Sequence, residues 1–216
     1  MERGLFITFE GSEGCGKSTQ IDVLGRRLGV AGHEFLVTRE PGGTAVGETI
    51  RELLQYREEG EGMTAESEVL LFAASRAQLV REVVAPAVAA GKVVIADRFM
   101  DSTTVYQGVA RRLGGEAVGM INGFAVGDCV PDVTFLLDMD SETAHARATA
   151  ASGEAGRKDR MESQPLSFYE DVRAGYLELA KAEGGRICVL DATRKVDEIG
   201  AEIWGILKER FDGVFG

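Results

Sequence analysis

The sequence is poor in residue types that would mark several other classes of protein. Its 216 residues include 3 Cys and 2 His. These are too few for a disulfide framework or a His-based metal site, and sparse cysteines suit a reducing compartment. The longest apolar stretches, such as 93–96, are far shorter than the roughly 18 residues of a membrane span, and no signal-peptide core precedes them. We therefore expect a cytoplasmic protein.

Basic residues are fewer than acidic ones, 24 Lys and Arg against 35 Asp and Glu, which gives a net charge of −11. Such a chain repels DNA and anionic membranes, so we expect neither as a partner. Hydrophobic residues make up 44% and charged residues 27%, as in ordinary globular proteins. Because no repeat or linker divides the chain, we expect a single domain over residues 1–216.

Five short apolar runs alternate with segments long enough for helices. This alternation is typical of right-handed βαβ crossovers, and it predicts an α/β fold whose parallel sheet is covered on both faces. The runs are 5–9, 35–38, 93–96, 133–137 and 187–190, and helical spacing covers 17–29, 64–90, 165–183 and 195–211. Two stretches break the pattern: 58–62, interpreted as a solvated turn, and 150–164, interpreted as a mobile lid.

A glycine-rich segment directly after the first run carries the strongest functional signal. Residues 11–18 match the pattern G-x-x-x-x-G-K-[ST], between a predicted strand and a predicted helix. Glycines let backbone N–H groups turn around phosphate oxygens, Lys17 reaches the β and γ phosphates, and the Ser18 hydroxyl is free for Mg²⁺. The expected nucleotide-binding residues are Gly11, Ser12, Glu13, Gly14, Cys15, Gly16, Lys17, Ser18 and Thr19.

An acidic residue follows the third run. The position of Asp97 places a carboxylate at the carboxyl edge of the sheet, beside the glycine-rich loop, where it can hold Mg²⁺. The alternative is that Asp97 only caps the next helix. Arg98 stands beside it, and a fixed guanidinium there suggests a second phosphate group to be bound.

An arginine interrupts the apolar stripe of the helix predicted over 64–90. Arg76 lies four residues after Phe72, so both fall on one face. One interpretation is a buried arginine paired with a structural glutamate. The other is a pocket in which Phe72 stacks on a nucleobase and Arg76 bonds its edge. Thr103 and Gln107 are also four apart on a polar segment.

Taken together, these motifs resemble those of the thymidylate kinase family along nearly the whole chain. The matching blocks are 9–19, 38–44, 71–76, 97–99, 102 with 106–108, 131–132 and 159–162. The resemblance implies a P-loop nucleoside-monophosphate kinase fold with strand order 2-3-1-4-5. It also implies transfer of the ATP γ-phosphate to dTMP, giving dTDP, by an enzyme that usually forms homodimers.

The resemblance also implies roles for individual residues. Phe72 would stack on thymine, Arg76 would bond the base, Arg98 would hold the acceptor phosphate, and Glu13 would help place the acceptor and its metal. The remaining substrate-binding residues implied are Glu40, Pro41, Thr103, Tyr106 and Gln107, with Ser18 and Asp97 at Mg²⁺.

Glu13 is followed by Gly14, and in this respect the chain resembles the bacterial branch of the family, in which the lid supplies a catalytic arginine. Arg157 and Arg160 are the candidates for this residue. In-line phosphoryl transfer depends on alignment and charge neutralisation, so the predicted catalytic residues are Glu13, Lys17, Arg98 and these two arginines.

Three other functions fit parts of the sequence. A kinase of the same fold for another nucleotide or a deoxynucleoside is disfavoured by Phe72, Arg76 and Tyr106. A GTP-dependent switch needs an Asn-Lys-x-Asp or Thr-Lys-x-Asp motif, but the chain's sole Asn is followed by glycine and no Thr-Lys pair occurs. A DNA-handling ATPase is disfavoured by the net charge and the lack of a basic stripe.

Overall fold

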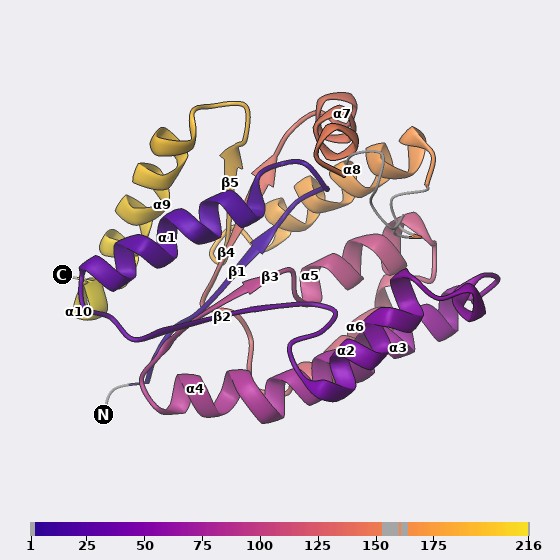
Figure 1. Ribbon diagram of the computed structural model, residues 1–216, viewed down its shortest axis with the longest axis horizontal. Helices are drawn as coiled ribbons and strands as arrows, with labels where there is room; N and C mark the ends of the chain where they lie inside the picture. Colours follow the sequence, from indigo (N-terminus) through magenta and orange to yellow (C-terminus); the bar gives the residue numbers. More distant parts are fainter. Residues whose placement is uncertain (1–2, 153–159, 161–163, 216) are drawn as a thin grey trace.

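The fold is a parallel sheet between two layers of helices (Figure 1). The structure is a computed structural model that describes residues 3–152, 160 and 164–215. The strands are β1 (Phe6–Glu10), β2 (Phe35–Arg39), β3 (Val93–Asp97), β4 (Val133–Asp138) and β5 (Ile187–Asp191). Their order is β2-β3-β1-β4-β5, which confirms the predicted topology.

The register fixes which ends of the strands meet. Phe9 of β1 pairs with Asp97 of β3 and with Phe135 of β4, all in parallel. The carboxyl ends of the central strands therefore reach the same edge, and the loops after β1 and β3 leave it side by side. Ligands of open α/β sheets bind at this edge.

One face of the sheet is covered by α1 (Lys17–Val30), α9 (Val196–Arg210) and the short α10 (Asp212–Phe215). Ile7 and Phe9 point toward this layer and pack with Leu24 and Ile203. Because side chains alternate along a strand, their neighbours in β1 face the opposite layer. The helices predicted at 17–29 and 195–211 are thus confirmed within a residue or two at each end.

The other face is covered by the remaining long helices, of which α2, α3 and α6 lie together (Figure 1). The helix predicted over 64–90 is continuous but contains a π segment before Pro86. This layer comprises α2 (Ala45–Gln55), α3 (Ala65–Leu79), η2 (Val80–Val84), α4 (Ala85–Ala89), α5 (Met100–Thr103), η3 (Thr104–Ala110), α6 (Gly115–Val126) and α8 (Leu166–Ala182). The remaining helices are η1 (Glu58–Gly60) and α7 (Ser141–Ser152).

The structure differs from the sequence prediction at β2 and at the segment 58–62. β2 is not buried on both faces, because it is an edge strand and Phe35 and Val37 are exposed. The segment 58–62, predicted to be a solvated turn, contains the 3-10 helix η1, in which Gly60 is buried although Glu58 and Glu59 are exposed. No helix in the described part of the chain is long and apolar enough to cross a membrane.

Candidate active site

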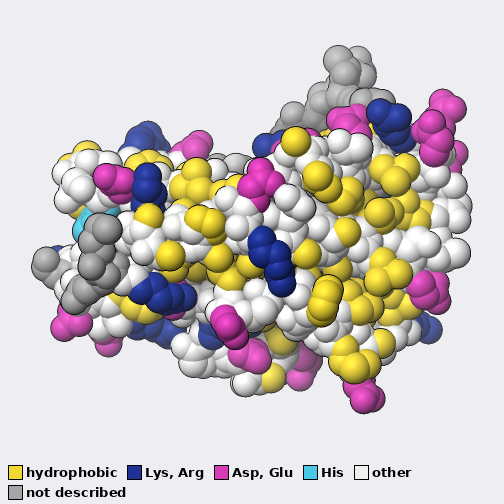
Figure 2. Space-filling view, turned by 90° about the horizontal axis from the view of Figure 1, so that it is seen from below, with side chains coloured by type: hydrophobic (Ala, Val, Ile, Leu, Met, Phe, Trp, Pro, Cys, Tyr) yellow, Lys and Arg dark blue, Asp and Glu magenta, His cyan; other side chains and the backbone are white. Residues whose placement is uncertain are grey.

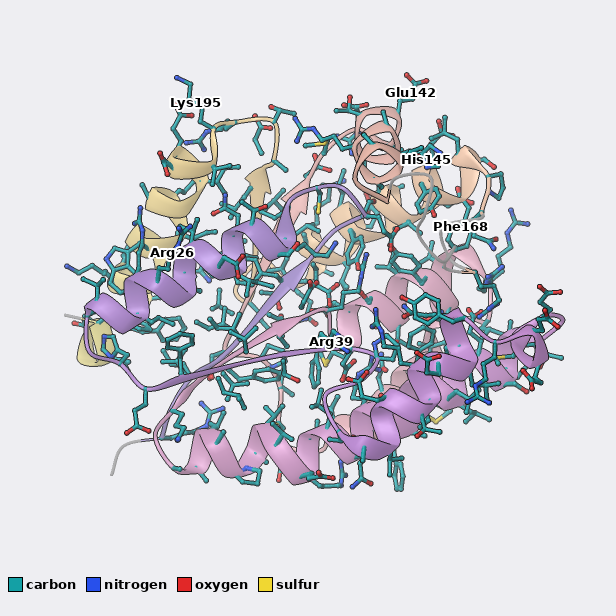
Figure 3. All side chains as sticks on the ribbon, in the orientation of Figure 1. Arg26, Arg39, Glu142, His145, Phe168 and Lys195 are labelled. Atoms are coloured by element: carbon teal, nitrogen blue, oxygen red, sulfur yellow. The ribbon has the colours of Figure 1, made fainter. Side chains whose placement is uncertain are left out.

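A cavity of about 560 Å³ opens at the carboxyl edge of the sheet. Figure 3 labels Arg39, which lies at the end of β2 and lines this cavity. The cavity brings together the glycine-rich loop, the end of β3, α3, and the segment α5–η3. Of the predicted site residues, it is lined by Glu13, Gly14, Gly16, Lys17, Ser18, Thr19, Glu40, Pro41, Phe72, Arg76, Asp97, Arg98, Thr103, Tyr106 and Gln107. Gly11, Ser12 and Cys15 are buried within the loop itself.

The loop after β1 has the backbone shape that a phosphate site requires. Gly14 and Gly16 have φ of 78° and 94°, a left-handed region that glycine adopts at little cost. A Cβ on Gly14 would lie 2.2 Å from the backbone oxygen of Ala144, so α7 packs directly on the loop. The Lys17 Nζ donates to the backbone oxygens of Gly11 (3.1 Å) and Ser12 (2.8 Å). The loop is therefore folded around its own lysine.

Arg98 is held at the end of β3 by both its backbone and its side chain. Its φ is 70°, which is uncommon for a residue other than glycine. Its guanidinium donates to Glu13 Oε1 (2.9 Å) and Ser102 Oγ (3.2 Å), and it lies 5.2 Å from the Tyr106 ring centroid. Burial alone would lower the pKa of Arg98, but Tyr106, Glu13 and other acidic neighbours raise it overall. The guanidinium is a fixed cation in the cavity.

The carboxylates beside Arg98 fit a magnesium ion. Asp97 Oδ1 and Glu13 Oε2 are buried and have no hydrogen-bond partner among the described residues, and Ser18 is exposed in the cavity. Mg²⁺ takes one or two carboxylates together with substrate phosphates and water. The alternative role of Asp97 as a helix cap is not seen, because the N-cap of α5 is Phe99, without a side-chain cap.

A buried carboxylate behind Arg98 was not foreseen from the sequence. Glu10 accepts hydrogen bonds from the Phe99 and Ser102 N–H groups (2.8 and 3.2 Å) and from the Tyr176 hydroxyl (2.7 Å). Burial, followed by the charge of Asp101, raises the pKa of Glu10. This carboxylate fixes the backbone that carries Arg98. Its signal in the sequence was an acidic residue ending an otherwise apolar strand.

Arg76 is paired with Glu40, as one of the two interpretations predicted. The guanidinium is 1% exposed and donates through Nε and Nη2 to Glu40 Oε2 (2.8 and 2.6 Å). It also donates to Asn122 Oδ1 (2.7 Å) and Thr103 Oγ1 (2.9 Å). Burial raises the pKa of Glu40 to about 7, against the opposing effect of Arg76. Because Arg76 also lines the cavity, the pairing does not remove it from a binding role.

The other predicted base-side residues surround the same space. Phe72 is half-buried and lies one helical turn before Arg76 on α3. Tyr106 is 5% exposed, and its buried hydroxyl has no hydrogen-bond partner among the described residues. Burial raises the pKa of Tyr106, so the hydroxyl stays protonated. The cavity thus presents an aromatic face, a guanidinium and a hydroxyl to a ligand.

The two arginines predicted for the lid are Arg157 and Arg160. Arg157 lies outside the described residues. Arg160 donates to Glu68 Oε2 (2.5 Å) and to the Leu54 backbone oxygen (3.0 Å). In this structure Arg160 therefore joins the end of α2 to α3 and does not line the cavity.

Sequence reasoning gave no role to several side chains that line the cavity, among them the arginines Arg51 and Arg147. Arg51 and Gln55 are four residues apart on α2, and Arg51 donates to the Pro41 backbone oxygen (2.9 Å). Gln55 Oε1 is buried without a partner among the described residues. Tyr56 follows α2, and Arg147 projects from α7 beside the glycine-rich loop. The i,i+4 spacing of Arg51 and Gln55 was the available signal.

Comparison with known proteins agrees with this geometry. The family model for thymidylate kinase matches residues 9–203. The chain belongs to the thymidylate kinase family. It is 47% identical to the thymidylate kinase of Deinococcus radiodurans over 97% of this chain and 99% of that protein. It is 45% identical to the thymidylate kinase of Pelodictyon phaeoclathratiforme (96% and 97% covered) and 46% identical to that of Halothermothrix orenii (95% and 97%).

Proposed function

We propose that this cavity is where the reaction of the thymidylate kinase family takes place in this chain. The reaction is the phosphorylation of dTMP to dTDP, with ATP as the phosphate donor. One observation carries the assignment of the site: the same cavity is lined by the phosphate loop and by the Phe72–Arg76 pair. A donor phosphate and a planar acceptor can therefore meet within it.

The acceptor nucleotide occupies the side formed by α3 and α5–η3. Phe72 stacks on thymine, and Arg76 and Thr103 lie at the base edge, with Glu40, Pro41 and Gln107 around them. Tyr106 packs against the deoxyribose, where a 2′-hydroxyl would otherwise fit. Arg98, held by Glu13, binds the acceptor phosphate. A guanidinium that is already fixed loses little entropy on binding.

The ATP phosphates occupy the loop of residues 11–19. On binding, Lys17 exchanges the oxygens of Gly11 and Ser12 for phosphate oxygens, and the backbone N–H groups bond the same phosphates. Ser18 and Asp97 would hold Mg²⁺, with Glu13 beside it, and the ion would supply positive charge to neutralise the phosphates. Arg98 and Lys17 then align the two phosphates and exclude water between them.

A coupled assay of ADP release tests this function. With ATP and Mg²⁺, dTMP is expected to give the highest kcat/KM, with dUMP slower and dCMP and UMP at least 100-fold slower, because a pocket that bonds a substrate edge rejects the mismatched edge strongly. A preference for dCMP or UMP would overturn the assignment of the base pocket.

The lid arginine is tested by two matched variants. Arg160 is already bound to Glu68 and Leu54, which favours Arg157 as the residue that reaches the transferring phosphate. We expect Arg157→Ala to lower kcat by about 10³-fold or more with little change in ATP binding. Arg160→Ala is expected to act mainly on stability. The reverse result would assign the role to Arg160.

The homodimer is also part of this proposal. Figure 2 shows apolar side chains gathered on the face to which α2, α3 and α6 contribute. Leu70, Met120 and Phe124 are 57%, 66% and 84% exposed, and such a patch marks an interaction surface. Light scattering should give a dimer for the native chain and a monomer for Phe124→Glu. A native monomer at micromolar concentration would contradict the proposal. We also propose a cytoplasmic location, which fits a chain that is poor in cysteine.

A further inference from the structure

Two helical segments face each other across the base side of the cavity, and matching residues join them. On α3, Glu68, Phe72 and Arg76 are four residues apart and share a face. On the facing segment, Thr103 and Gln107 are also four apart. Arg76 Nη2 donates to Thr103 Oγ1 (2.9 Å), and one turn away Gln107 Nε2 donates to Glu68 Oε1 (2.9 Å).

Glu68 lies behind the side chains that line the cavity. It is 1% exposed, and two guanidinium groups donate to it: Arg160 Nη2 at 2.5 Å and Arg111 Nε at 3.4 Å. A carboxylate paired with guanidinium groups in this way offers only acceptor oxygens to its other neighbours. Every group that faces Glu68 must therefore be a donor.

This requirement fixes the orientation of the Gln107 amide. The NH₂ group must face Glu68, because a flipped amide would place a carbonyl oxygen against a carboxylate oxygen inside the protein. The Gln107 side chain is almost fully buried and lines the cavity, and its Oε1 has no hydrogen-bond partner among the described residues. Gln107 Oε1 is therefore available to accept a hydrogen bond from a ligand in the cavity.

Arg76 places a hydrogen-bond donor about one helical turn from the Gln107 acceptor. Arg76 has five N–H groups, and its second Nη1 hydrogen has no acceptor among the described residues. A donor on Arg76 and an acceptor on Gln107, both lining the cavity, complement a ring edge that offers a carbonyl oxygen next to an N–H. Thymine and uracil present that edge through O4 and N3–H, whereas cytosine presents an amino group and a bare N3.

We propose that Glu68 is a positioning residue for base selectivity. By accepting from the Gln107 NH₂ group, it turns the Gln107 carbonyl toward the N3–H of the substrate base and excludes cytosine. This inference rests on the proposed function, in which dTMP occupies the cavity. Glu68 itself does not touch the substrate.

The decisive experiment uses Glu68→Gln. A glutamine at 68 can donate as well as accept, so Gln107 becomes free to flip and to donate to N3 of cytosine. The ratio of kcat/KM for dTMP to that for dCMP should fall by about tenfold or more. The change should lie mainly in KM, with kcat for dTMP altered less than threefold. An unchanged ratio would overturn the proposal.

The monophosphate of 3-methylthymidine gives a second readout. The native enzyme should use it poorly, because N3 no longer carries a hydrogen for the Gln107 carbonyl, and Glu68→Gln should discriminate against it less. Equal discrimination by both proteins would count against the proposal. A purely structural role of Glu68 would lower thermal stability and activity toward all acceptors together.

Arg111→Gln is the matched control, because it removes a donor to the same carboxylate without freeing the Gln107 amide. It should keep the native dTMP/dCMP ratio.

If Glu68→Gln fails to fold, Gln107→Leu removes the acceptor directly and should reduce the same ratio; a native ratio in this variant would overturn the proposal. A native enzyme inactive on dTMP would defeat the proposed function, whereas an active one with a ratio insensitive to position 68 would defeat this inference alone.

Discussion

The phosphate side and the base side of the cavity are built in different ways. On the phosphate side, the important groups come from one short loop, and Lys17 is satisfied by backbone oxygens of that loop. On the base side, buried charges are paired over long distances in the sequence, as in Arg76 with Glu40 and Arg160 with Glu68. Residues on the base side should therefore determine both binding and stability, whereas Lys17 should determine catalysis alone.

Lys17→Met should give the largest effect on activity. Removal of a preorganised cation from the transferring phosphate is expected to lower kcat by about 10³-fold. The free energy of unfolding should change much less than in Arg76→Met below, because no buried charge loses its partner. Steady-state kinetics and urea unfolding measure the two quantities, with exposed Lys208→Met as the control. Equal losses of stability in the two variants would erase the proposed difference between the two sides.

Arg76→Met should give the largest effect on stability. It leaves the Glu40 carboxylate buried and unpaired, which costs about 3–5 kcal/mol of unfolding free energy. The double variant with Glu40→Gln should recover part of that loss. Arg26→Met, at an exposed position on α1, is the control. A loss under 1 kcal/mol would mean that the pair contributes little to the fold.

Gly14→Ala should give an intermediate effect. The added Cβ would lie 2.2 Å from the Ala144 oxygen, so α7 must move away from the loop, and we expect KM for ATP to rise about tenfold. Gly32→Ala is a matched control, because its φ of 81° imposes similar strain, about 1–2 kcal/mol, with nothing within 4 Å. Similar kinetics in the two variants would exclude the α7 contact as the cause.

The smallest effect concerns pH. The pKa of Glu40 is raised by burial to about 7, so between its ordinary value and about pH 7 the folded chain holds a proton that the unfolded chain has released. The contribution of Glu40 to the unfolding free energy should therefore decrease as pH rises through this window. Urea unfolding at several pH values should show that decrease in the native chain relative to Glu40→Gln. Parallel curves would contradict it.

The same difference explains what the sequence could predict. The strand order followed from the family resemblance and is confirmed, and the phosphate loop is a contiguous motif whose function resides in its backbone. Pairs such as Arg76–Glu40, separated by 36 residues, arise only when the chain folds. Local patterns in a sequence, such as spacing along one helix or one loop, indicated Arg76 and Glu40 as site residues but not their direct pairing.

Other residues escaped prediction for the same physical reason. Glu10 and Tyr176, separated by 166 residues, form a buried hydrogen bond that no local spacing indicates. Glu68 occupies an inward position of α3, but the sequence does not show that Gln107 and two arginines meet it there.

The left-handed backbone of Arg98 has a consequence for laboratory evolution. A residue other than glycine at φ 70° carries a conformational cost of about 1–3 kcal/mol, which glycine would relieve. A library screened only for heat tolerance should therefore enrich Gly or Asn at position 98 at the expense of turnover. Screens that select for thermal endurance and for catalysis should accordingly diverge at this one codon.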